Sequence, residues 1–314
     1  MDLQHVRYFV AVFEHGSINA AAAAVGAAQP TISEALRSLE RELKASLFYR
    51  IGRGMVPTSA GHAFAGPARM MLRDVVTAAG AVPDAEGNLR GRVDLRAHPS
   101  VSTGLLPEIV AAYHRRHPKV QVTIGAMYDE TQAAPLLRNA VCEIVVAHLP
   151  LPAAEEAGGA AAADGPGGLE TVELGTQEYA LALPPEDGSP AMAGLSWEDL
   201  DVTMVVVPQG NAHAQRMVAA MTARQRSRRP AVVLQNREAR LAFALAGVAP
   251  TWIERSAAGI ALSRGARVRT MEPPLPGPYG LVFDSGGLSP AAAAFVGVAT
   301  EVAASRNAAA PGDS

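Results

Sequence analysis

One predicted helix, at residues 29–42, carries side chains that can read double-stranded DNA. At about 100° per residue its apolar side chains share one side: Ile32, Leu36, Leu39 and Leu43. The opposite side, its flank and the first turn carry a second set: Gln29, Pro30, Thr31, Ser33, Glu34, Arg37 and Arg41. Amide, hydroxyl and guanidinium groups are the donors and acceptors that base edges and phosphates require. A solvated amphipathic helix without a DNA-binding role would show a similar pattern, so the choice between the two interpretations depends on the elements that precede this helix.

Two shorter predicted helices precede it. An apolar stripe from Leu3 to Phe13 predicts the first, which can end at Gly16 in the left-handed conformation. Ser17 can cap the second, which stops at Gly26, and we include Ser17 among the expected DNA contacts. Gln29 stands at the expected cap of the third helix and Pro30 at its first helical position. Residues 16–41 therefore predict a helix-turn-helix.

The segment 47–58, LFYRIGRGMVPT, predicts a two-stranded wing. We expect Arg50 and Arg53 at its tip, where they can meet phosphates or the minor groove. The pair Gly52 and Gly54 could instead suggest a phosphate-binding loop, but no strand-then-helix context surrounds it.

Residues 1–90 resemble the LysR-type transcriptional regulators, on the motif FVAVFEHGSINAAAAAVGAAQPTISEALRSLERELKASLFYRIGRGMVPTSAG and the long helix after it. The resemblance implies that the positions of Gln29, Pro30, Thr31, Ser33 and Arg37 begin or line the recognition helix, and that Arg50 and Arg53 belong to the wing. Glu34 departs from the family pattern. It can accept from a cytosine amino group, or pair with Arg37 or Arg41. Pro57 also stands where a leucine is usual.

Charge argues for a few well-placed cations over a basic DNA-coating surface. Residues 1–58 hold six basic and five acidic side chains, and the 314-residue chain has a formal net charge of −3. Weak binding by one unit favours a homodimer or homotetramer, with RNA polymerase as a further candidate partner. The single cysteine, the absence of a signal-peptide pattern and the short apolar tracts lead us to expect a cytoplasmic protein without a membrane partner.

A long helix is predicted after the wing, capped by Thr58 or Ser59, with an apolar stripe from Phe64 to Ala79. The family resemblance makes residues 59–89 a linker helix that forms the dimer interface. Packing against its own chain is the alternative. The segment PDAEGNLRG, 83–91, then predicts a domain boundary.

From residue 90 to 305, alternating strand and helix patterns predict a mainly parallel sheet with helices on both faces. The order resembles the two-lobed effector domain of the same family, which is similar to periplasmic solute-binding proteins. We expect lobe I at about 90–162 and 270–305, lobe II at about 163–269, with crossings near 160–168 and 266–272, and a disordered tail at 306–314. The overall expectation is an α/β fold with an N-terminal winged helix-turn-helix, a linker helix and this domain.

A small-molecule effector of unknown identity is expected between the lobes, at the carboxyl ends of strands. Ser100, Ser102 and Thr103 precede a helix and can hold an anion, or simply cap that helix. Further candidates follow other strands: Tyr128, Asp129, Gln209, Asn211 and Thr251.

Catalytic chemistry, metals and cofactors are not expected. The sequence DSGG at 284–287 is similar to a serine-protease loop but lies in an α/β pattern. His114 and His117 are spaced as a metal pair, although a solvated face is the simpler interpretation. Cys142 fits a small core residue better than a redox sensor.

Two hypotheses remain. In the first, the chain is a DNA-binding regulator that senses a metabolite. In the second, it is a solute-binding or enzymatic α/β domain whose N-terminal helices mediate protein contacts. The second leaves the polar front of residues 29–42 and the two wing arginines without a role.

Overall fold

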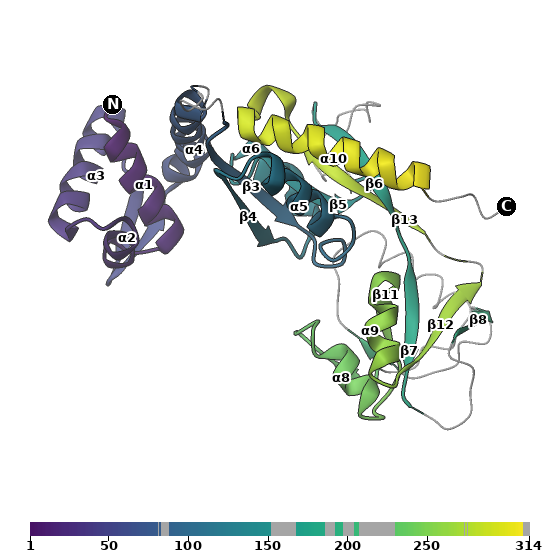
Figure 1. The fold of residues 1–314 in the computed structure, drawn as a ribbon. Helices are drawn as coiled ribbons and strands as arrows, with labels where there is room; N and C mark the ends of the chain where they lie inside the picture. The colour runs from purple at the N-terminus through teal and green to yellow at the C-terminus, as the bar shows by residue number, and fades with distance from the viewer. Residues whose placement is uncertain are drawn as a thin grey trace.

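A winged helix-turn-helix forms the N-terminal unit of the computed structural model, which describes residues 1–80, 82, 88–151, 168–185, 192–196, 204–206, 230–272, 274 and 276–309. Its elements are α1 (Leu3–His15), α2 (Ile18–Val25), α3 (Gln29–Leu43), β1 (Phe48–Ile51) and β2 (Gly54–Pro57). The predicted apolar sides meet in one core, in which Phe9, Ile32 and Leu39 are fully buried. Figure 1 shows α4 between this unit and the rest of the chain.

Glycines and a serine fix the turns, as predicted. Gly16 and Gly26 end α1 and α2 with φ of 67° and 66°, a conformation that costs glycine little. The Ser17 hydroxyl oxygen accepts from the Ala20 N–H at 3.2 Å, so Ser17 caps α2. The expected cap of α3 is displaced by one residue: Ala28 is the N-cap, and Gln29 and Pro30 already lie in the helix. Pro30 fits there because its fixed φ suits the first turn of a helix.

The linker helix α4 (Ser59–Gly80) begins at a cap formed by Thr58, one of the two predicted candidates. The Thr58 hydroxyl accepts from the Gly61 N–H at 3.0 Å and donates to the Ser46 carbonyl at 2.7 Å. The first half of α4 packs on α1, where the Arg69 guanidinium pairs with Glu14 at 3.2 Å.

The first lobe is a five-stranded sheet in the order β4-β3-β5-β13-β6. Its elements are β3 (Gly91–Ala97), α5 (Leu106–Arg116), β4 (Val120–Ala126), α6 (Ala133–Arg138), β5 (Ile144–His148), β6 (Glu170–Gln177), β13 (Gly277–Phe283) and α10 (Pro290–Ala309). Figure 1 shows α5 and α10 together over one face of this sheet. A second cluster, which includes α6, packs on the other face. The central strand β5 is buried along its whole length for this reason.

The second lobe holds a six-stranded sheet in the order β10-β9-β11-β7-β12-β8. Its elements are β7 (Tyr179–Leu183), β8 (Met192–Ser196), β9 (Val205–Val206), β10 (Val232–Val233), α8 (Arg240–Leu245), β11 (Thr251–Glu254), α9 (Ala258–Ser263) and β12 (Arg267–Glu272). The helices α8 and α9 cover the small core of this lobe.

Three sequence expectations need correction. The sheets are mixed instead of mainly parallel, because β7 and β13, which enter a lobe from the other lobe, pair antiparallel to their neighbours. The first crossing lies between Gln177 and Tyr179 and not near 160–168, because β6 still belongs to the first sheet. The second crossing follows β12, after 266–272.

The last helix, α10, runs further toward the C-terminus than expected. Residues 306–309, expected in a disordered tail at 306–314, continue α10. Their helical conformation extends a helix whose buried side chains already pack on the first sheet. In the part of the chain that the structure describes, no helix combines the length and apolarity needed to cross a bilayer.

We predict opposite effects from the same substitution at two helical glycines. A Cβ at Gly61 would overlap the Leu47 carbonyl oxygen, whereas a Cβ at Gly297 in α10 would meet nothing within 4 Å. Gly61→Ala should therefore lower the free energy of unfolding by about 1–3 kcal/mol. Gly297→Ala, the matched control, should raise it by about 0.5–1 kcal/mol. Urea unfolding followed by circular dichroism measures both, and equal stability of Gly61→Ala and the parent chain would contradict the packing.

The Cys142 thiol should be inert in the native chain. Cys142 is 2% exposed in the core beneath α6, and burial raises the pKa of its thiol to about 12. At pH 8 roughly one native thiol in ten thousand is then a thiolate, against about a quarter in the unfolded chain. Ellman's reagent should label the guanidinium-unfolded chain fully within minutes and leave the native chain unlabelled. Rapid native labelling would revive the redox-sensor alternative.

Candidate nucleic-acid interface and interlobe site

The front of α3 carries exposed polar side chains, and its back is buried, as predicted. Gln29, Pro30, Thr31 and Glu34 are exposed, as are the guanidinium groups of Arg37 and Arg41, while Ser33 is half-buried. The N-cap of the helix is Ala28, which offers no side-chain acceptor to the N–H groups of the first turn. These N–H groups and the positive end of the helix dipole form a setting that favours a phosphate.

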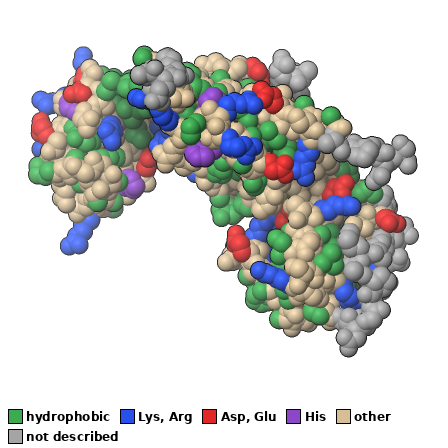
Figure 2. All heavy atoms as spheres, in the orientation of Figure 1, with side chains coloured by type: hydrophobic (Ala, Val, Ile, Leu, Met, Phe, Trp, Pro, Cys, Tyr) green, Lys and Arg blue, Asp and Glu red, His purple; other side chains and the backbone are tan. Residues whose placement is uncertain are grey.

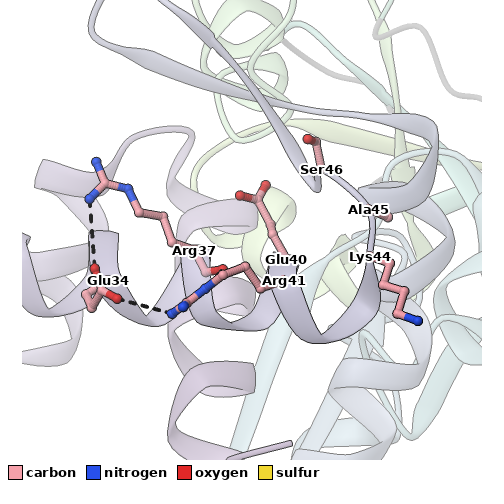
Figure 3. A pocket seen from close by; sticks show the side chains of 7 residues that line it. All are labelled: Glu34, Arg37, Glu40, Arg41, Lys44, Ala45 and Ser46. Atoms are coloured by element: carbon pink, nitrogen blue, oxygen red, sulfur yellow. Dashed lines mark hydrogen bonds and ion pairs between the residues drawn. The ribbon is translucent and has the colours of Figure 1, made fainter.

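Glu34 pairs with both candidate arginines. Its carboxylate oxygens lie 3.8 Å from Arg37 Nη1 and 3.4 Å from Arg41 Nη2, and the three side chains are about 70% exposed. Figure 3 shows Glu34 between the two guanidinium groups, in a shallow hollow that continues to Lys44 and Ser46. Exposed ion pairs of this kind contribute about 0–1 kcal/mol each, so a DNA phosphate can displace Glu34 at small cost.

The wing is tied to the helix-turn-helix by one backbone hydrogen bond. The Met55 N–H donates to the Gly16 carbonyl at 2.8 Å, which joins β2 to the turn between α1 and α2. Arg53 lies in the turn between the strands, beside Gly52 with a φ of 59°. Arg50 was expected at the tip as well, but it pairs with Met55 inside the ribbon, because only residues 52 and 53 form the turn. Both arginines are exposed.

The expected effector residues Ser100 and Ser102 lie after β3, where both hydroxyls bond to His98. Ser100 is fully buried with Oγ 2.6 Å from His98 Nδ1, and Ser102 Oγ donates to the His98 carbonyl at 3.0 Å. Neither of them caps α5, whose N-cap is Leu105. Thr103 is exposed.

The described side chains of the other effector candidates do not converge on this point. Tyr128 is 71% exposed, and the Asp129 carboxylate accepts from the backbone and hydroxyl of Thr131. Thr251 is 1% exposed and donates to the Val205 carbonyl at 3.1 Å, so its hydroxyl joins β11 to β9. Gln209 and Asn211 lie outside the described residues.

Sequence reasoning missed two histidines beside Ser100. The dipeptide Ala-His stands at the carboxyl ends of the parallel neighbours β3 and β5, as Ala97-His98, where the histidine follows β3, and as Ala147-His148; this repeat was the available signal. Burial lowers the pKa of His98 to about 4, with smaller contributions from Glu130, which opposes the shift, and from His148. His98 is therefore a neutral imidazole near pH 7.

Groups from the second lobe complete this polar region. Tyr179, the first residue of β7, is a neighbour of Ser100, and burial raises the pKa of its phenol. The positive charge of Arg237 also lowers the pKa of His98. This charge is balanced by Glu254, whose carboxylate pairs with both Arg237 and Arg240. Burial, followed by the neighbouring charge of Arg237, lowers the pKa of Arg240 to about 9. Donors and acceptors from both lobes thus meet at the boundary between them.

Two protein-family models match the chain, one over the helix-turn-helix unit and one over the two lobes. The model "Bacterial regulatory helix-turn-helix protein, lysR family" matches residues 3–62, and the model "LysR substrate binding domain" matches residues 86–304. Among curated relatives, PtxR of Pseudomonas aeruginosa is 37% identical over 126 residues, 40% of each chain. TfdT of Cupriavidus pinatubonensis is 27% identical over 67% of this chain and 87% of its own. The chain thus spans less than half the length of PtxR in that match.

The crystal structure of CbnR, described as a LysR family transcriptional regulator, has the same fold. It superposes with a TM-score of 0.67 and 22% identity, over 96% of this chain and 99% of CbnR. CbnR has also been solved with its target DNA, at the same TM-score. Because the substrate-binding-domain model alone matches more than half of the residues, the chain belongs to the LysR family.

Proposed function

We propose that the chain is a sequence-specific DNA-binding transcriptional regulator whose effector domain binds a small molecule between its lobes. The exposed front of α3, set beside a wing that carries Arg53, supports the DNA-binding part most directly. Family membership and the solved complex of CbnR with its target DNA support the same part. Protein contact by the N-terminal helices is the weaker hypothesis, because it gives these exposed cations no role.

In this proposal α3 enters the major groove and the wing meets the backbone. Thr31, Ser33 and Arg37 face base edges, and the first turn of α3 with Ser17 and Gln29 approaches phosphates. Glu34 holds Arg37 and Arg41 in place until DNA competes for them. Arg50 and Arg53 contact phosphates or the minor groove.

A second copy of the chain is needed for useful affinity. Figure 2 shows Lys and Arg side chains mixed with Asp and Glu over the visible face, in keeping with the net charge of −3. Few cations per unit give weak binding, which two linked units strengthen through effective concentration. We place the contact between copies on α4, where Val75 and Val76 are 46% and 47% exposed although they belong to its apolar stripe.

The effector is proposed to lie at the interlobe boundary, near Ser100 and Tyr179. This region combines hydroxyl, imidazole and guanidinium groups, which suit a small polar or anionic molecule. A thermal-shift screen of small carboxylates and aromatic compounds tests this part, because a ligand of the native state raises the unfolding temperature.

Two arginine substitutions should weaken DNA binding in different ways. Arg37→Ala removes a base-edge contact and should weaken binding to the intergenic DNA beside the chain's own gene by about 5- to 150-fold. Arg53→Ala removes a phosphate contact and should weaken binding to all sequences while reducing the salt slope by about 1. Fluorescence anisotropy at several salt concentrations measures both.

Arg116→Ala is the matched control for these variants. Arg116 is a similarly exposed arginine on α5, paired with Glu301 at 2.8 Å and remote from α3 and the wing. It should leave DNA affinity unchanged. DNA binding that survives both Arg37→Ala and Arg53→Ala would overturn the proposed interface.

A charge on the apolar stripe of α4 should weaken self-association. Val76→Asp places a carboxylate in the proposed interface, and sedimentation velocity should show a shift from dimer or tetramer toward monomer. Met70→Asp is the control, because Met70 is 45% exposed but lies on the other side of α4 at about 100° per residue. Equal association of the two variants would exclude this stripe as the interface.

A further inference from the structure

Three metal-ligating side chains meet at the carboxyl ends of β3 and β5. They are His98, Glu130 and His148, which are 2%, 1% and 1% exposed. One donor atom from each lies within 4.8 Å of the donor atoms of the other two. His98 and His148 follow from the parallel pairing of β3 and β5, and Glu130 comes from the 3₁₀ turn after β4.

Glu130 is held against His148 by one of its two carboxylate oxygens. Oε1 accepts from the backbone N–H of His148 at 2.8 Å and lies 2.7 Å from its Nδ1. Oε2 is buried and has no hydrogen-bond partner among the described residues. A buried carboxylate oxygen without a partner carries a desolvation cost of about 1–3 kcal/mol or more, because nothing replaces the water it has lost.

Ser100 connects the two rings. Its Oγ lies 2.6 Å from His98 Nδ1 and 3.5 Å from His148 Nε2. The hydroxyl has a single proton, which it can donate to only one ring at a time. This region is thus rich in nitrogen and oxygen acceptors that a cation can satisfy together.

We propose that His98, Glu130 and His148 bind one divalent transition-metal ion, of the class of Zn²⁺ or Co²⁺. Two imidazoles and one carboxylate are the ligand set that borderline divalent ions prefer. Bonds of about 2.0–2.2 Å place neighbouring ligands about 3.3–3.5 Å apart, so side-chain shifts of about 1 Å bring the donors together.

Binding requires a defined exchange of partners at His148. An ion bound to both His148 Nδ1 and Glu130 lies between them, so the ring proton moves to Nε2 and faces Ser100 Oγ. A hydroxyl in that place orients the ligand ring, as outer partners of metal-bound histidines do. The nearby positive charge of Arg237 would oppose a bound cation, but it is balanced by the carboxylate of Glu254.

The first experiment uses the full chain without an affinity tag, dialysed against a chelator. Isothermal titration with Zn²⁺ should give one site per chain, and Zn²⁺ should raise the unfolding temperature. Co²⁺ should give d–d absorption bands of a four- or five-coordinate site. X-ray absorption of the Zn²⁺ complex should show a first shell of nitrogen and oxygen with two imidazoles.

Variants then assign the ion to these residues. His148→Gln and Glu130→Gln should each weaken Zn²⁺ binding by at least about 100-fold, the glutamine of the latter still being able to accept from the His148 N–H. The double variant His114→Gln/His117→Gln is the matched control on α5, and it should bind Zn²⁺ as the parent chain does.

Three outcomes would overturn the proposal. In the first, the parent chain takes up no Zn²⁺. In the second, a folded His148→Gln or Glu130→Gln variant keeps the Zn²⁺ affinity of the parent chain. In the third, the His114→Gln/His117→Gln control loses that affinity. If neither single variant folds, the absorption spectrum of the parent complex decides, because a first shell with fewer than two imidazoles contradicts this ligand set.

Discussion

Close backbone contact along α4 is the constraint on which the arrangement of the parts depends. The helix packs on the DNA-binding unit through Gly61, which has no room for a Cβ against Leu47, and on the first lobe through Gly66, where a Cβ would lie 3.1 Å from Asn139 Oδ1. Arg69 adds an ion pair to Glu14, and Arg73 reaches the Cys142 carbonyl. Small residues thus let one helix hold both units, while Val75 and Val76 stay exposed. The contact of α4 with its own chain is therefore compatible with the interface between copies that we propose, because the two use different sides of the helix.

Weak charge shapes the DNA-binding surface. Glu34 offsets one of the two positive charges that Arg37 and Arg41 place on the front of α3, since both arginines share its carboxylate. So small a net positive charge disfavours indiscriminate binding to phosphates, because counterion release is then small, and in the proposed function base contacts choose the site. The pairs are exposed and worth little, so the arginines remain available to DNA.

The interlobe region differs from the front of α3 because its polar groups are buried. Its hydroxyl, imidazole and carboxyl groups are buried, so each must be satisfied locally or by a ligand. Ser100 was predicted from its place after a strand, but its neighbours His148 and Tyr179 stand at the end of β5 and the start of β7, which the sequence separates widely from it. Thr251 also follows the predicted pattern, yet its hydroxyl bonds within the second sheet. A position after a strand identifies a polar residue as a candidate for the site. Only the pairing of the strands decides which of these candidates lie together.

The sequence by itself determined the helix-turn-helix, the wing, the cap at Ser17, the cap of α4 to within Thr58 or Ser59, and the buried side of α3. These features depend on periodicity, left-handed glycines and capping, which act over a few residues. Tertiary structure alone decided the crossing after Gln177, the mixed sheets and the meeting of His98, Glu130 and His148. The reason is physical: strand order and side-chain rotamers depend on contacts between distant segments, and no local pattern encodes those contacts.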